Sequence, residues 1–195
     1  MTVVLAGKIG WALMVTAWYV IRYPYERRSK RASVETNAKG SREYWRMAIA
    51  GSGLGILPAL YLWTSLLDFA DRSASWLLIA TGLICGTGAL AMFVLTHKAL
   101  GKLWSVSLQL KQEHRLVTQG IYEKLRHPMY TGFWLMALAQ ALFLANWIAG
   151  LSGLIGFGIL FFSRIGPEEK MMEAAFGDEY RAYQRRSWRV IPHVW

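Results

Sequence analysis

Charged residues and cysteines are both scarce in this chain, and each shortage excludes a class of protein. Only 17% of the 195 residues are charged and 54% are hydrophobic, which argues against a disordered chain and against a coiled coil. The single cysteine, Cys85, cannot form an intramolecular disulfide, and its apolar surroundings predict an inert, buried packing residue. No group of Cys and His has zinc-site spacing, so we expect no metal.

Acidic residues are the scarcer of the two charged kinds. The 12 Asp and Glu stand against 22 Lys and Arg, which gives a net charge of +10. In a soluble protein such an excess is typical of nucleic-acid binding. The apolar content here instead favours a membrane protein whose positive charges lie in loops on one side. We therefore expect membrane lipids, including anionic headgroups, as partners and no nucleic acid.

Long hydrophobic runs are abundant. A bilayer core about 30 Å thick needs roughly 20 mainly apolar residues per helix. The runs predict an all-α integral membrane protein, a single domain over 1–195, with five transmembrane helices. Their approximate ranges are 3–21, 47–67, 76–95, 130–145 and 147–163. The last two divide one uncharged stretch that is too long for a single span, with a hairpin turn at Asn146.

Small residues recur at a spacing of four within three of the predicted spans. The pairs are Gly51 and Gly55, Gly82 and Gly86, and Ser152 and Gly156. On a helix such pairs lie on one face and let a neighbouring backbone approach. We expect close helix packing at all three.

The basic residues alternate along the chain between rich and poor segments. Lys and Arg are frequent over 22–46, 96–130 and 164–195, and rare near 68–75 and at Asn146. The positive-inside rule then predicts a multi-pass protein of the cell membrane with its N-terminus outside and its C-terminus in the cytoplasm. The segments 96–130 and 164–195 would both be cytoplasmic.

Polar side chains concentrate in these two segments. Gly120 predicts a turn, and His127 followed by Pro128 predicts an extended residue before the first turn of the fourth span. We expect the fifth span to end near Gly166 and a new helix to restart at Pro167.

Each candidate residue also has a purely structural interpretation. His114 could be an exposed loop histidine, and His127 a junction residue. Tyr130 could belong to the aromatic belt at the membrane surface. Arg164 could be a snorkelling anchor at the end of a span, and Glu168 its ion-pair partner or a favourable charge in a first helical turn.

A series of motifs runs in a fixed order through about 109–192. It reads His114-x-Leu116-Val117-x-x-Gly120-x-Tyr122, Arg126-His127-Pro128-x-Tyr130-x-Gly132, Arg164, Glu168-Glu169, Phe176-Gly177-x-x-Tyr180-x-x-Tyr183, then Arg189 and Pro192. In these motifs the sequence resembles the isoprenylcysteine carboxyl methyltransferase family, in a short form typical of prokaryotic, archaeal members. The family belongs to a wider group of membrane methyltransferases that includes phospholipid N-methyltransferases.

The resemblance implies S-adenosylmethionine (SAM) as the cofactor, S-adenosylhomocysteine as its product, and a pocket in the cytoplasmic C-terminal half. By the resemblance this pocket is lined by Gln109, His114, Leu116, Val117, Tyr122, His127, Pro128, Met129, Tyr130 and Glu168. Backbone N–H groups around Val117 and Gly120 could bind the carboxylate or the adenine edge of SAM. Arg164 would face the methyl acceptor, so Arg164 and Glu168 are the catalytic candidates.

The chemistry of SAM agrees with these residue types. Glu168 could pair with its ammonium group, and Tyr122 or Tyr130 could offer a ring face to its sulfonium. A carboxylate acceptor needs no general base, because it is already ionised near pH 7. The planar guanidinium of Arg164 could hold such a carboxylate at the membrane edge. The sequence thus predicts a SAM-dependent O-methyltransferase of a prenylated cysteine or a similar lipid-soluble acid.

Two other functions stay open at this point. An amine-lipid N-methyltransferase of the wider group would need a base, since an ammonium acceptor must first lose a proton. A non-enzymatic transporter or lipid-binding scaffold is less favoured, because Lys8 is the only clear ionisable residue within the spans and lies near one end.

Overall fold

The computed structural model describes residues 2–29, 41–101 and 116–194. Within these ranges the regular structure is helical, and β-type pairing is limited to two isolated bridges. The elements in order are α1 (Val3–Ser29), α2 (Ser41–Gly51), the π-helical η1 (Ser52–Ile56), α3 (Leu57–Trp63), η2 (Asp68–Ala70), α4 (Trp76–Leu100), η4 (Gly120–Glu123), α5 (Pro128–Phe143) and α6 (Trp147–Arg186).

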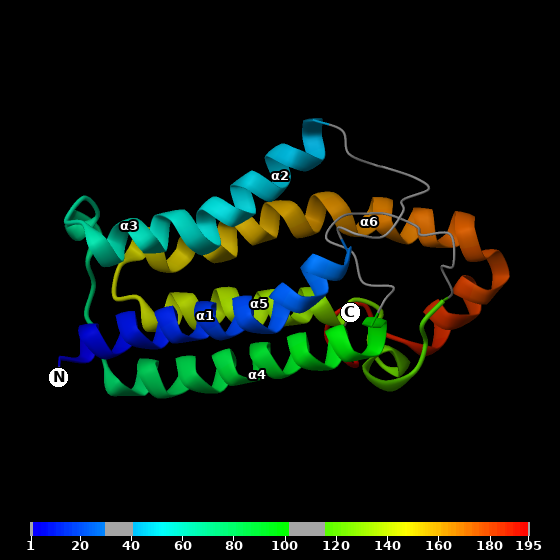
Figure 1. The fold of residues 1–195 in the computed structure, drawn as a ribbon, viewed down its shortest axis with the longest axis horizontal. Helices are drawn as coiled ribbons and strands as arrows, with labels where there is room; N and C mark the ends of the chain where they lie inside the picture. The colour runs from blue at the N-terminus through cyan, green and yellow to red at the C-terminus, as the bar shows by residue number, and fades with distance from the viewer. Residues whose placement is uncertain (1, 30–40, 102–115, 195) are drawn as a thin grey trace.

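The long helices lie side by side along one axis, and consecutive ones run in opposite directions (Figure 1). The α2, η1 and α3 segments form one rod that packs along α6, while α4 packs against α5 and α1. Among the described residues, α1, α4 and α6 are long and apolar enough to cross a membrane. The protein is therefore an all-helical membrane protein by composition and helix length.

Two apolar clusters hold the bundle together. One surrounds Phe93 and Phe143, between α1, α4 and α5. The other surrounds Phe157 and Phe161 on α6 and includes Tyr130 at the start of α5. Because the second cluster reaches the first turn of α5, it fixes that helix end against α6. Cys85 is half-buried beside the first cluster, rather than fully buried as expected.

Each of the five predicted ranges is occupied mainly by helix, and the hairpin at Asn146 is confirmed. The Asn146 side chain accepts a hydrogen bond from Ala149 N at 2.9 Å and so caps the start of α6. Its amide donates to Asp71 Oδ1 at 2.9 Å, which ties the hairpin to the connection before α4. The boundaries differ: α1 continues to Ser29, and α3 ends at Trp63 rather than at Leu67.

The predicted helix break at Gly166 and Pro167 is wrong. The helix α6 continues through Pro167, and its non-helical residue is Gly177, with φ +53° and ψ −125°. Proline removes one backbone hydrogen bond, but Ile165 and Glu169 are buried on either side of it and hold both halves of the helix in place. Gly177 can take this positive φ because it has no Cβ.

Small-residue packing is confirmed at two of the three predicted pairs. A Cβ on Gly82 or Gly156 would lie under 3.0 Å from a neighbouring helix. Gly51 and Gly55 have open space instead. The close approach there is made by Gly53, whose Cβ position lies 2.2 Å from Ser152 O. The π-helical turn shifts the register of this helix, so the four-residue spacing selected the wrong face.

Candidate active site

The candidate site lies where α5 begins beside the middle of α6. His127 is the N-cap residue of α5, and its side chain does not cap the helix. Pro128 occupies the first turn, as the sequence predicts, but His127, with φ −127° and ψ 56°, is not extended as expected. The His127 backbone N–H donates to Arg189 O at 2.9 Å. The His127 ring stacks on Tyr130, with ring centroids 5.5 Å apart and planes 18° from parallel. This junction brings two candidate side chains together at one helix end.

A pair of charged residues on α6 faces the same place. The Tyr130 hydroxyl donates a hydrogen bond to Glu168 Oε2. Arg164, one helical turn before Glu168, has its Nε 3.4 Å from Glu43 Oε1 on α2. Arg164 and Glu43 both lie close enough to act electrostatically on the Tyr130 hydroxyl. Tyr130, Arg164, Glu168 and Glu43 therefore form one compact polar group.

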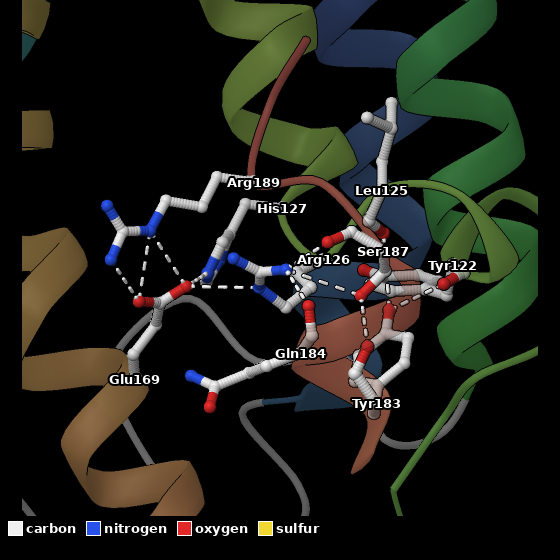
Figure 2. A network of polar contacts seen from close by, with 9 residues as sticks. All are labelled: Tyr122, Leu125, Arg126, His127, Glu169, Tyr183, Gln184, Ser187 and Arg189. Carbon is white, nitrogen blue, oxygen red and sulfur yellow. Dashed lines mark hydrogen bonds and ion pairs between the residues drawn. The ribbon is translucent and has the colours of Figure 1, made fainter. Parts of the chain in front are cut away.

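Glu169 is the centre of an adjoining network (Figure 2). Its carboxylate accepts hydrogen bonds from Arg126 Nε at 3.1 Å and from Arg189 Nη2 at 2.8 Å, and His127 Nε2 lies 3.4 Å away. Burial alone would raise the pKa of this carboxyl, but the contacts with His127 and Arg189 outweigh it and lower the pKa to about 2. Glu169 is therefore an ionised structural anchor.

The C-terminal segment clamps the residues before α5. Arg126 N donates to Trp188 O at 2.7 Å, and Trp188 N donates to Lys124 O at 2.9 Å. The Tyr183 hydroxyl donates to the backbone carbonyls of Tyr122 and of Leu125, as Figure 2 shows. Tyr122 is fully enclosed, and this burial raises the pKa of its hydroxyl. The loop with the predicted cofactor residues is thus held by the end of the chain.

The structure brings together only part of the predicted set. His127, Tyr130, Arg164 and Glu168 lie around one point, with Tyr122 and Pro128 buried nearby. Gly120 adopts the predicted turn, with φ +62°. Met129 packs instead against the apolar cluster around Phe93 and Phe143, because it faces away from Tyr130 on the first turn of α5.

The remaining predicted residues are Leu116, Val117, Gln109 and His114. Leu116 and Val117 are half-buried in an irregular segment. Gln109 and His114 lie outside the described residues.

The sequence did not predict the residues that contact the candidate side chains from other segments of the chain. Glu43 is far from Arg164 in the chain and lies in a strongly basic segment, with no motif that links the two. Arg126, Glu169 and Arg189 belong to the quoted motifs, but nothing in their spacing predicts that they meet. The adjacent acids Glu168 and Glu169 carried the one available signal. Because neighbouring residues on a helix point in different directions, two adjacent acids indicate two separate groups of partners.

Three buried polar atoms bear on whether the site can take a ligand. His127 Nε2, Glu43 Oε1 and Arg164 Nε make no hydrogen bond with any described residue. Arg164 Nε and Glu43 Oε1 face each other at 3.4 Å, and His127 Nε2 lies 3.4 Å from Glu169 Oε1. Buried polar atoms are nearly always hydrogen-bonded, so these positions could accept a polar ligand. No group of three or more His, Cys, Asp or Glu suited to a metal occurs in the part of the chain that the structure describes.

Comparisons with known proteins point to one family. The model of the isoprenylcysteine carboxyl methyltransferase (ICMT) family matches residues 78–174. The protein-S-isoprenylcysteine O-methyltransferase of Schizosaccharomyces pombe is 36% identical over 46% of this chain and 38% of its own length. The human protein of that name is 33% identical over 42% and 28%. A probable protein-S-isoprenylcysteine O-methyltransferase of Oryza sativa subsp. indica is 25% identical over 67% and 70%.

The matched region spans less than half the length of the Schizosaccharomyces pombe and human relatives. It includes α5 and the part of α6 that carries Arg164, Glu168 and Glu169. All of α1 and all of α2, with Glu43, precede the family match.

Proposed function

We propose that this chain, which matches the isoprenylcysteine carboxyl methyltransferase family over residues 78–174, methylates the carboxylate of a prenylated cysteine or a similar lipid-soluble acid. The single observation that carries the proposal is the placement of Arg164 and Glu168 one turn apart on α6, both beside the Tyr130 hydroxyl. Opposite charges at that spacing suit a negative acceptor and a positively charged methyl donor placed side by side.

The donor we propose is SAM, and the buried polar atoms around His127 fit it. When bound, SAM supplies a methyl group on a positively charged sulfur. Glu168, held by the Tyr130 hydroxyl, would pair with its ammonium group. Tyr130 and His127 present stacked rings at the same place for the adenine or the sulfonium. Tyr122 and the backbone around Val117 and Gly120 would complete the pocket.

Arg164 would hold the acceptor carboxylate in line with the methyl group. A carboxylate oxygen forms the new O–CH₃ bond while the S–CH₃ bond breaks, and the electron pair of that bond stays on sulfur. The acceptor loses its negative charge, the sulfur becomes a neutral thioether, and no proton moves. The protein contributes alignment and exclusion of water rather than a general base.

We further propose five membrane spans, with the N-terminus outside and the site at the cytoplasmic surface. Before its non-helical residue Gly177, α6 has 30 residues (147–176), about 45 Å at 1.5 Å per residue, which is roughly one and a half times the hydrocarbon thickness. Its uncharged first half would cross the membrane, and Arg164 would mark the surface. A prenyl chain could then stay among the helices while its carboxylate reaches Arg164.

Ligand-induced stabilisation of the purified protein tests the assigned roles. S-adenosylhomocysteine at 100 times its dissociation constant should stabilise the wild type by about 2.7 kcal/mol. Glu168→Gln should lose most of this shift, because the ammonium partner is gone. Arg164→Ala should keep it, because Arg164 faces the acceptor. Equal loss in both variants, or no shift in the wild type, would contradict the assignment.

A further inference from the structure

Arg164 already faces a carboxylate from its own chain. Glu43 Oε1, in the first turn of α2, lies 3.4 Å from Arg164 Nε, and the two side chains are only 9% and 11% exposed. Neither atom makes a hydrogen bond with a described residue. The two charges are thus close and buried, but no hydrogen bond joins the two nearest atoms, Arg164 Nε and Glu43 Oε1.

The charge balance around the site allows only one carboxylate to be paired with Arg164 at a time. Arg164 carries +1, and Glu43 and Glu168 carry −1 each. A bound donor with one net positive charge compensates Glu168, and Glu43 compensates Arg164. An acceptor carboxylate then adds a second negative charge beside a single guanidinium, and like charges repel strongly where water is excluded.

We propose that Glu43 and the acceptor carboxylate alternate as the partner of Arg164. This inference rests on the proposed function. In the free protein Glu43 neutralises Arg164, and the incoming carboxylate takes its place. Methylation removes the acceptor's charge, so Glu43 returns to the guanidinium and the ester leaves no buried charge unpaired. Glu43 is therefore a specificity-determining residue that sets the relative affinity for acid and ester.

Equilibrium binding to the full chain in the presence of S-adenosylhomocysteine tests this alternation. The probes are N-acetyl-S-farnesylcysteine and its methyl ester, measured on wild type and on Glu43→Gln. Removing the competing charge should tighten binding of the acid on the order of tenfold and leave binding of the ester unchanged. The matched control is Glu173→Gln, which removes a half-exposed carboxylate paired with Arg181 on the same α6 helix and should alter neither affinity.

Acid binding that is unchanged or weaker in Glu43→Gln would overturn the inference. If wild type methylates the acid but Glu43→Gln binds it no better, only the inference fails and the proposed function stands. If wild type binds S-adenosylhomocysteine but not the acid, both fail. Glu43→Asp keeps the charge and shortens its reach by one methylene, so it should tighten acid binding by a smaller factor. It is the decisive variant if Glu43→Gln does not fold.

Discussion

Glu169 is the residue that joins three separate segments of the chain beside the candidate site. It contacts Arg126 before α5, His127 at the start of α5 and Arg189 in the C-terminal segment. Its carboxylate is buried, so a neutral replacement leaves the buried guanidinium of Arg126 and the half-buried guanidinium of Arg189 without their counter-charge. Glu169→Gln should lower the free energy of unfolding by about 3 kcal/mol, measured by thermal or denaturant unfolding in detergent.

The control for this prediction lies on the same helix. Glu173 pairs with Arg181, and the two side chains are 42% and 47% exposed. An exposed pair contributes about 0–1 kcal/mol, so Glu173→Gln should change stability little. If Glu169→Gln and Glu173→Gln lowered the free energy of unfolding equally, burial would not explain the stabilising effect of Glu169.

The stabilisation by Glu169 should also depend on pH. Its pKa is lowered in the folded protein from 4.5 to about 2, because its contacts with His127 and Arg189 outweigh the penalty of burial. A lowered pKa means that the stabilisation is complete above pH 4.5 and is lost as the pH falls toward 2. The difference in melting temperature between wild type and Glu169→Gln should therefore shrink between pH 5 and pH 3. If the difference in melting temperature stayed constant from pH 5 to pH 3, the ionised Glu169 carboxylate would not be the source of the stabilisation.

At the scale of elements, the contact between η1 and α6 depends on one glycine. The Gly53 carbonyl accepts hydrogen bonds from Ser152 Oγ at 2.7 Å and from Gln140 Nε2 at 3.0 Å. A Cβ on Gly53 would lie 2.2 Å from Ser152 O, so Gly53→Ala must push the helices apart. The expected cost is about 3 kcal/mol of overpacking, measured by unfolding in detergent.

Gly55 provides a matched control two residues away in η1. Nothing lies within 4 Å of its Cβ position, so Gly55→Ala should be neutral or stabilise the protein by up to about 1 kcal/mol. If Gly55→Ala were as damaging as Gly53→Ala, the effect would come from the π-helical backbone rather than from the contact with α6.

The elements themselves were largely predictable because apolar runs of sufficient length dictate helices in a membrane. The hairpin turn at Asn146, the turn at Gly120 and the helix start at Pro128 are confirmed, whereas the cap that the Asn146 side chain provides was not predicted. The break was predicted at Pro167, but packing on both sides of this residue overrides the local effect of proline, and the non-helical residue is Gly177.

The candidate site was only partly predictable, for a different reason. Motifs identify His127, Tyr130, Arg164 and Glu168, since their order along the chain carries the family resemblance. The pairing of Arg164 with Glu43 depends on how α2 packs along α6. No periodicity within either helix encodes that contact, so only the folded structure reveals it.

At the scale of the whole molecule, the proposed topology places the two ends of the bundle on opposite sides of the membrane. Phe69 is 80% exposed in η2 at one end, and Ala174 is exposed on α6 beyond the apolar half. In a Cys85→Ala background, a membrane-impermeant maleimide should label Phe69→Cys in intact cells. It should label Ala174→Cys only after the cells are opened. The reverse pattern would invert the topology, and labelling of both in intact cells would reject the five-span arrangement.

The central claim is that Arg164 directs methyl transfer to a lipid-soluble carboxylate. The most direct measurement offers labelled SAM to the purified protein with N-acetyl-S-farnesylcysteine and phosphatidylethanolamine side by side. The account predicts an alkali-labile methyl ester on the prenylcysteine, no label on the amine lipid, and loss of transfer in Arg164→Ala with S-adenosylhomocysteine binding retained. Methylation of the amine lipid instead, or wild-type turnover of the acid by Arg164→Ala, would contradict it.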